Sequence, residues 1–195
     1  MLPPQWATVS GKRLSMNDFA SEFVRAWSKL VKRSIKLECW QNYREQEFNR
    51  SQDVFMAGDV ESATRLLKEE AEEDRPLYEE IKLRKLDHTR IRLVKKPLTP
   101  YLEYELISYK IRLAMGENIE VVLFDGGISL PSTEFFDFLL FDGSLALVHD
   151  YGTDGFQVGG WLVEEPEVIR RLEEIAVDLR SRSSPLAEFL RTANV

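Results

Sequence analysis

The chain has 195 residues, of which 44% are hydrophobic and 30% are charged, as in ordinary globular proteins. This length suits one domain with a single core. The formal net charge is −7, which opposes adhesion to nucleic-acid phosphates or to anionic lipid unless a local basic face overrides it. We therefore expect neither nucleic acid nor a membrane as a direct partner.

The N-terminal residues and the number of cysteines indicate the cellular compartment in which the protein is expected. Cys39 is the sole cysteine, which excludes an intrachain disulfide framework and favours a reducing, cytoplasmic location. Residues 1–16 contain no continuous apolar run and predict a flexible N-terminus rather than a signal peptide. No segment reaches the roughly 20 apolar residues that a membrane span needs.

Residues 17–87 are predicted to form a mostly helical lobe with one strand. Helices are expected over residues 18–31, 46–56, 60 to about 74 and 76 to about 86, and a half-buried strand over residues 34–40. Asn17 and Asp59 are the expected helix N-caps because their side chains can accept a hydrogen bond from the first helical turn. Pro76 suits the first turn of the helix that it opens.

Residues 88–195 are predicted to form a mixed α/β lobe. Strands are expected over residues 89–95, 119–124, 136–141, 144–149 and 156–163, and helices over residues 100–115, 167–182 and from 184. Asp142-Gly143 between two apolar runs is a strong hairpin signal, and pairing Phe141 with Ser144 would place Asp137 opposite Val148. Both faces of this hairpin are apolar, so helices should cover both faces of the sheet. The prediction is one α+β domain over residues 1–195, with a mixed sheet that contains this buried hairpin.

The predicted helix over residues 100–115 carries two apolar stripes and leaves Glu103, Lys110 and Ala114 as a narrow outer strip. Such a helix is buried on more than one side. Either the rest of the domain covers both stripes, or a second chain covers one of them.

Recognisable catalytic motifs are missing from the sequence. Two histidines and one cysteine without CxxC or HExxH spacing argue against a zinc site, and we expect no metal and no cofactor. Gly126-Gly127 and Gly159-Gly160 lie outside any phosphate-binding motif and fit a turn and a strand irregularity better than a phosphate cradle. We assign no catalytic residue and lean toward a protein that is not an enzyme.

Asp137, His149 and Asp150 meet at the open end of the predicted hairpin of residues 136–149. Two carboxylates and an imidazole could hold a cation or act as general acid and base. The competing interpretation is structural, because Asp150 precedes a glycine-containing turn and His149 ends a buried strand.

Several stretches of the sequence are similar to one known family. These are Leu37-Glu38, Tyr43, residues 55–59, residues 92–94, residues 97–106, Gly116-Glu117 and residues 138–142. They resemble an actinobacterial family of domains of unknown function, number 6879, over residues 17–180. Members are commonly encoded beside helix-turn-helix regulators, so the resemblance implies a regulatory role and such a regulator as partner. Among the matching positions we single out Tyr43, Tyr101 and Glu105, the last two lying one turn apart on a mostly apolar helix.

The order of elements in the C-terminal half also resembles half of a phospholipase D type fold. The catalytic HxK(x4)D pattern fails, because Tyr151 and Arg90 stand at the lysine position after His149 and His88. The resemblance therefore implies a degenerate relative without phosphodiesterase chemistry.

Two hypotheses follow from the sequence. The first is a non-enzymatic accessory or regulatory protein that binds a protein partner, either a helix-turn-helix regulator or a second copy of itself, through the helix of residues 100–115. The second is a small-molecule-binding or hydrolytic domain with its site at the open end of the hairpin. The candidate binding residues are Tyr43, Tyr101, Glu105, Asp137, His149 and Asp150.

Overall fold

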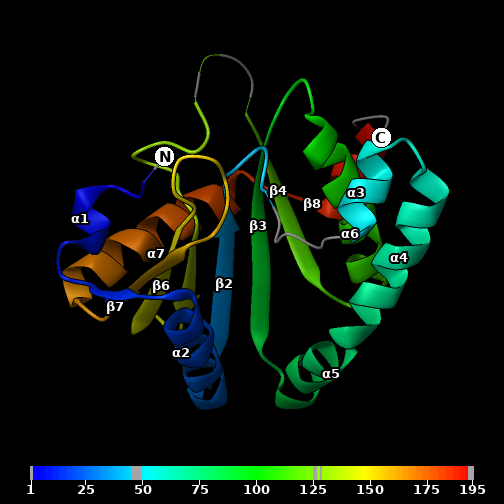
Figure 1. Ribbon diagram of the computed structural model, residues 1–195. Helices are drawn as coiled ribbons and strands as arrows, with labels where there is room; N and C mark the ends of the chain where they lie inside the picture. Colours follow the sequence, from blue (N-terminus) through cyan, green and yellow to red (C-terminus); the bar gives the residue numbers. More distant parts are fainter. Residues whose placement is uncertain (1, 45–49, 125–126, 128, 193–195) are drawn as a thin grey trace.

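The computed structural model describes residues 2–44, 50–124, 127 and 129–192, which fold around one mixed eight-stranded sheet in the order β1-β7-β6-β5-β2-β3-β4-β8 (Figure 1). The strands are β1 (Lys12–Leu14), β2 (Arg33–Glu38), β3 (Asp87–Lys95), β4 (Asn118–Phe124), β5 (Phe138–Phe141), β6 (Leu145–Asp150), β7 (Gly159–Val163) and β8 (Ser184–Pro185). β2, β3 and β4 are parallel, and the other pairs are antiparallel. Because β2 lies between β5 and β3, the two predicted lobes share one sheet.

Eight helices accompany the sheet within the described residues. They are α1 (Gln5–Thr8), α2 (Met16–Lys29), α3 (Arg50–Met56), α4 (Val60–Glu73), α5 (Arg75–Arg84), α6 (Pro100–Ala114), α7 (Pro166–Ser181) and α8 (Leu186–Thr192). The caps at Asp59 and Thr99 accept hydrogen bonds from Ser62 N and Leu102 N at 3.0 and 3.1 Å, as expected for N-caps. Residues 46–49 of the helix predicted over residues 46–56 lie outside the described residues.

The first long helix starts earlier than predicted. Ser15, not Asn17, caps α2, and its hydroxyl accepts a hydrogen bond from Asp18 N at 3.2 Å. The reason is that β1 ends at Leu14 and leaves Ser15 extended, so the helix begins directly after the strand.

Residues 1–16 were predicted to be flexible, and this was wrong for the part that the structure describes. β1 pairs with β7 as an edge strand, and Leu14 and Ala7 are buried at 2% and 0% exposure. A strand of three residues whose partner lies about 150 residues away leaves almost no periodic signal in the sequence, which explains the miss.

Helices cover both faces of the sheet, as predicted. On one face α7 packs against a core formed by β2, β3, β5 and β6, with Leu172, Ala176 and Leu179 fully buried. On the other face α2 packs against β5, β6 and β7 through Phe19 and Trp27. Figure 1 shows α2 on one side of this second face and the α3 to α6 group on the other.

The register between β5 and β6 differs by one residue from the prediction. Ser144 N donates to Phe141 O at 3.1 Å, and Asp142 and Gly143 both have positive φ. Phe141 nevertheless pairs with Leu145, so one extra residue enters the second strand, as in a β-bulge. As a result, Leu139 and Phe141 share a face with Leu145 and Leu147, whereas the predicted register would have put them with Ala146 and Val148. At the open end of the hairpin, His149 N donates to Asp137 O at 3.0 Å.

Both apolar stripes of α6 are covered by the chain itself. Leu102, Leu106 and Tyr109 pack against β4 and α8, while Tyr101 and Tyr104 pack against α3 and α4. Glu103, Lys110 and Ala114 are exposed, as the pattern predicted.

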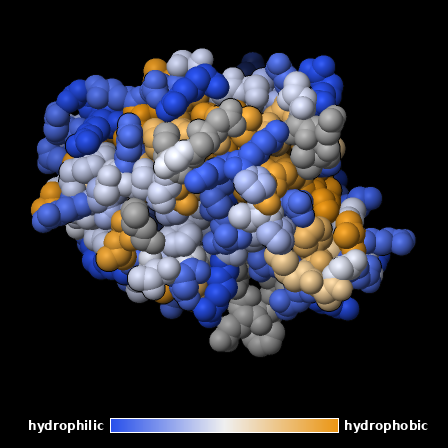
Figure 2. All heavy atoms as spheres, turned by 90° about the horizontal axis from the view of Figure 1, so that it is seen from above, coloured by the Kyte–Doolittle hydropathy of each residue, from blue (hydrophilic) through white to orange (hydrophobic). Residues whose placement is uncertain are grey.

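From above, hydrophilic atoms cover most of the surface and hydrophobic atoms gather mainly on the side of α3 and α4 (Figure 2). Met56 and Val60, at the junction of these two helices, are 49% and 48% exposed. Within the described residues, no helix is long and apolar enough to cross a bilayer.

Candidate functional site

A cavity of about 560 Å³ lies over the middle of the sheet, between α2 on one side and α4, α5 and α6 on the other. Its lining includes all six tyrosines and both histidines of the chain: Tyr43, Tyr78, Tyr101, Tyr104, Tyr109, Tyr151, His88 and His149. The volume falls within the roughly 300–1,000 Å³ of small-molecule sites. We call this cavity the tyrosine cleft.

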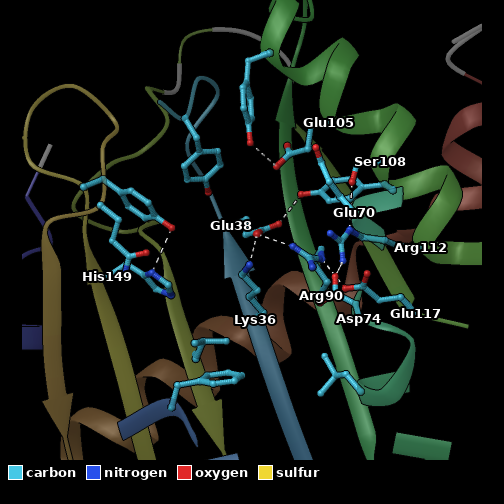
Figure 3. Close-up of a pocket in the computed structure, with 18 of the residues that line it drawn as sticks. Lys36, Glu38, Glu70, Asp74, Arg90, Glu105, Ser108, Arg112, Glu117 and His149 are labelled. Carbon is cyan, nitrogen blue, oxygen red and sulfur yellow. Dashed lines mark hydrogen bonds and ion pairs between the residues drawn. The ribbon is translucent and has the colours of Figure 1, made fainter. Parts of the chain in front are cut away.

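The floor of the tyrosine cleft carries charged side chains from two parallel strands. Lys36 and Glu38 alternate with the buried Ile35 and Leu37 along β2, so they point to the opposite face of the sheet. Glu38 binds Lys36 Nζ at 2.7 Å and, from β3, Arg90 at 2.6 Å. Figure 3 shows these three side chains meeting at the centre of the cleft.

A second ion pair lies deeper, against α6. Arg92 is fully buried, and its Nε donates to Glu105 at 2.8 Å while its terminal nitrogens donate to the carbonyls of Glu38 and Trp40 at 3.1 and 2.6 Å. Because buried charges need partners, these bonds allow a guanidinium in the core. Burial raises the pKa of Glu105 even though Arg92 opposes the shift.

The remaining floor carboxylates are held ionised. Burial alone would raise the pKa of Glu38, but Arg90 and Lys36 outweigh it and hold that pKa well below the usual range. Glu117 binds Arg90 at 2.7 Å, and its pKa is likewise lowered by this partner against the effect of burial. The floor is therefore a closed network of ion pairs.

Each tyrosine hydroxyl is already bound by the protein. The pairs are Tyr43 with Asp137, Tyr78 with Glu117 (2.8 Å), Tyr101 with Glu105 (3.2 Å), Tyr104 with Ser51 (2.8 Å), Tyr109 with Glu38 (2.5 Å) and Tyr151 with His149 (3.2 Å). Four of these partners are carboxylates that anchor the rings. The rings also contact one another, with Tyr43 5.4 Å from Tyr101 and 5.0 Å from Tyr151 between centroids. The cleft thus has a rigid aromatic wall.

Both histidines are neutral. Burial lowers the pKa of His88 to about 4 and that of His149 to about 3. His149 stacks parallel to Tyr151 at an interplanar angle of 3°, with Phe19 4.8 Å away. Among the described residues, His149 Nε2 is the one buried side-chain polar atom without a hydrogen-bond partner.

Asp137 lies directly behind the aromatic wall. Its carboxylate accepts hydrogen bonds from Tyr43 and, at 2.8 Å, from Cys39 N. Burial raises the pKa of Asp137 to about 7, although both hydrogen bonds oppose the shift. This carboxyl group can therefore exchange a proton near neutral pH.

The structure brings together most of the sequence-predicted binding residues. Tyr43, Tyr101, Glu105 and His149 line the tyrosine cleft, and Asp137 lies one hydrogen bond behind it. Asp150 points to the opposite face of the sheet, because it follows His149 along β6, and binds Arg13 at 2.6 Å. The predicted grouping of two aspartates around His149 therefore does not form.

Other residues that line the tyrosine cleft were not predicted from the sequence. The alternation of Lys36 and Glu38 in β2 and of Arg90 and Arg92 in β3 was visible in the sequence, but the prediction of a half-buried strand over residues 34–40 left its charged side in solvent. The missing information was that β2 and β3 are adjacent, with Lys36 beside Arg90 and Glu38 beside Arg92. Charged residues on two central strands of a sheet that is covered on both faces would have predicted a polar cavity over those strands.

The structure also places most of the possible metal ligands and the glycine pairs considered in the sequence. In the described part of the chain, no three His, Cys, Asp or Glu side chains are grouped as a metal site requires. Gly159 and Gly160 make room for packing, since a Cβ at Gly160 would lie 2.6 Å from the Phe19 ring. Gly126 lies outside the described residues.

Comparison with known families gives a match over nearly the whole chain. A family model described as "Domain of unknown function (DUF6879)" matches residues 21–191. The chain belongs to this family. No curated protein matches the sequence.

A solved structure offers a weaker likeness. It is described as that of TrmBL2, an archaeal chromatin protein that shows a novel mode of DNA binding, and it matches with a TM-score of 0.44 and 10% identity. The match covers 90% of this chain and 52% of the other, so this DUF6879 chain spans about half of that protein. A likeness at this TM-score supports no argument about fold or function.

Proposed function

We propose that this DUF6879 protein is a non-enzymatic domain that binds a small molecule in the tyrosine cleft. One observation carries the proposal: every tyrosine and every histidine of the chain lines this single cavity, although these residues are spread from residue 43 to residue 151. Packing alone gives no reason for all of them to gather there. A concave site with aromatic walls and a few fixed polar groups is the usual form of a ligand pocket.

The geometry favours binding over hydrolysis. The carboxylates of the cleft floor are occupied by Arg90, Arg92 and Lys36, so none of them is free to act as a general base. Asp150 lies on the opposite face from His149, which leaves that imidazole without an orienting carboxylate from this residue.

A protein partner is not needed to explain α6. That hypothesis rested on two apolar stripes, and the chain covers both of them. A helix-turn-helix regulator as partner stays a prediction from family resemblance, and a bound ligand could control such an association by shifting populations.

The test is a thermal-shift screen of chemically diverse metabolites, followed by NMR of ¹⁵N-tryptophan-labelled protein with each compound that raises the midpoint. Trp27 lines the cleft, whereas Trp6 and Trp161 do not. A ligand in the cleft shifts the Trp27 indole resonance and leaves those of Trp6 and Trp161 in place.

A matched pair of variants adds a control. Met16 lines the cleft, while Met56 is exposed outside it. Met16→Trp should abolish or weaken the thermal shift, and Met56→Trp should not. Hits that move Trp161 instead of Trp27, or a broad screen without hits, would overturn the proposal.

A further inference from the structure

In the tyrosine cleft, hydrogen-bond donors are more accessible to a ligand than the carboxylate acceptors are. This imbalance indicates the chemical class of the ligand. The ligand class inferred from these groups rests on the proposed function of the cleft.

Lys36 is the most accessible charged side chain of the floor. Its side chain is 29% exposed, compared with 12% for Arg90 and 7% for Glu38. The ammonium has three donors, and among the described residues Glu38 is its one ion-pair partner. Glu38 is also bound by Arg90 and Tyr109, so Lys36 can turn to a ligand without leaving a carboxylate bare.

His149 supplies a second donor. Within the described residues, the hydroxyl of Tyr151 has the Nδ1 atom of His149 as its one hydrogen-bond partner, at 3.2 Å. When this hydroxyl donates its proton, Nδ1 accepts, and the neutral ring carries its hydrogen on Nε2. Nε2 is buried and has no partner at normal hydrogen-bond distance, in a residue that is 8% exposed and lines the cleft; the Gln157 side chain is the neighbouring group that a ligand would replace there.

Lys36 and His149 belong to the same part of the cleft. Lys36 lies on β2 and His149 on β6, the second strand from β2 in the sheet, with β5 between them, and Figure 3 shows both side chains on the same face. Burial is the largest cause of the low pKa of His149, and the charge of Lys36 adds to it, while a hydrogen-bonding contact with the Gln157 side chain opposes the shift. An acceptor group between Lys36 and His149 would satisfy both donors.

Aromatic side chains stand beside these donors. Phe19, Phe23 and Trp27 project from α2 into the cleft, and Phe23 and Trp27 are stacked at 20° with centroids 6.0 Å apart. Flat rings of this kind favour a flat partner, because stacked and edge-to-face contacts add to the burial of apolar area.

The carboxylates of the cleft floor are less suited to a cationic ligand, because they already have cationic partners. Glu38, Glu105 and Glu117 are bound by arginine and tyrosine and are 7%, 9% and 1% exposed. Asp74 and Glu70 nearer the rim are bound by Arg112 and Ser51. Glu38, Glu105 and Glu117 are thus buried and paired with cations, whereas the Lys36 side chain is more exposed than any of them and His149 Nε2 has no partner at normal hydrogen-bond distance.

We infer that the tyrosine cleft binds an aromatic carboxylate, with the carboxylate group between Lys36 Nζ and His149 Nε2 and the ring against Phe19, Phe23 and Trp27. Indole-3-acetate and 2-naphthoate represent this class. Each can be compared with its neutral amide, with a matching aromatic amine and with cyclohexanecarboxylate.

Isothermal titration of wild-type protein with these probes tests the inference. The carboxylates should bind roughly tenfold or more tightly than their amides, because an amide oxygen can accept the same hydrogen bonds but lacks the negative charge that pairs with Lys36. Lys36→Met and His149→Phe should each weaken the carboxylates by a similar factor and leave the amides nearly unchanged. Lys32→Met removes the same charge at an exposed site outside the cleft and should change nothing.

The outcomes separate this inference from the proposed function. Tighter binding of an amide or an amine, or equal binding by wild type and Lys36→Met, overturns the ligand class, while the binding itself supports the cleft as a site. Absence of binding by every probe also overturns the ligand class, and the broad thermal-shift screen then decides whether the cleft binds small molecules at all.

Discussion

At the scale of single residues, burial sets the protonation state of the groups around the tyrosine cleft. Asp137 has its pKa raised by burial, and His88 and His149 have theirs lowered by burial. Both directions follow from the same rule, since a low-dielectric surrounding disfavours whichever form is charged. The linkage between protonation and folding makes each shift measurable as a pH-dependent stability.

Asp137→Asn is expected to change the pH dependence of stability. The pKa of the Asp137 carboxyl group is about 7 in the folded protein, compared with an ordinary value of 3.8. Its contribution to the free energy of unfolding is therefore fully present below about pH 4 and is lost as the pH rises through 7. The free energy of unfolding of wild type relative to Asp137→Asn should fall by about 4 kcal/mol between pH 4 and pH 8. Urea denaturation of both proteins at several pH values measures this difference, and parallel curves would contradict it.

The histidines should resist protonation in the folded protein. Their pKa values of about 4 and 3 lie below the ordinary 6.5, so the resulting stability is present above pH 6.5 and is lost as pH falls toward these values. Imidazole resonances of His88 and His149 should stay at their neutral positions at pH 5.5, while the chain in urea titrates near 6.5. A titration step above pH 6 in the folded state would show that the rings are more solvated than the structure indicates.

At the scale of elements, the second glycine of β7 allows α2 to lie directly on the sheet. A Cβ at Gly160 would lie 2.3 Å from Val148 O and 2.6 Å from the Phe19 ring. The close approach brings Phe19 to 4.8 Å from His149 and so forms the apolar end of the tyrosine cleft.

Gly160→Ala should therefore destabilise the protein. We expect a loss of roughly 2–3 kcal/mol in the free energy of unfolding, because neither the strand carbonyl nor the ring can move without disturbing α2. Gly127→Ala is the matched control, since nothing lies within 4 Å of its added Cβ. Thermal and urea unfolding of the two variants give the comparison, and equal stabilities would remove the packing explanation for Gly160.

The elements that could be predicted are those whose signals are local. The cap at Asp59 and the two-striped pattern of α6 depend on neighbouring residues, and the structure confirms them. The edge strands β1 and β8 depend on partners far away in the sequence, and the bulge after Asp142-Gly143 depends on turn geometry that the Asp-Gly pair alone does not specify. A one-residue slip changes which face each side chain occupies, so the predicted hairpin faces were wrong although the strands themselves were found.

At the scale of the whole molecule, the tyrosine cleft exists only because distant segments meet on one sheet face. β2 and β3 supply the floor, β6 one side, and α2 and α6 the walls. The prediction of Tyr43, Tyr101 and Glu105 came from family resemblance and that of His149 from the hairpin. No local pattern connects Lys36 with His149, which is why the cleft could not be predicted from the sequence.

The edges of this sheet lead to a further expectation. β1 and β8 have three and two residues, and short edge strands limit pairing with other molecules. Removal of residues 1–14 would expose the five residues of β7 as a new edge. It would also take Ala7 and Leu14 out of the core and leave the buried Asp150 without Arg13.

The variant lacking residues 1–14 should lose several kcal/mol of unfolding free energy, since burial of one leucine alone contributes roughly 2–5 kcal/mol in a core. It should also self-associate at high concentration through β7, which size-exclusion chromatography across a concentration series would detect. Arg13→Ala keeps β1 in place, so it should elute as wild type does and lose less stability. If the truncated chain matches Arg13→Ala in both measurements, β1 neither supports the core nor protects the edge of the sheet.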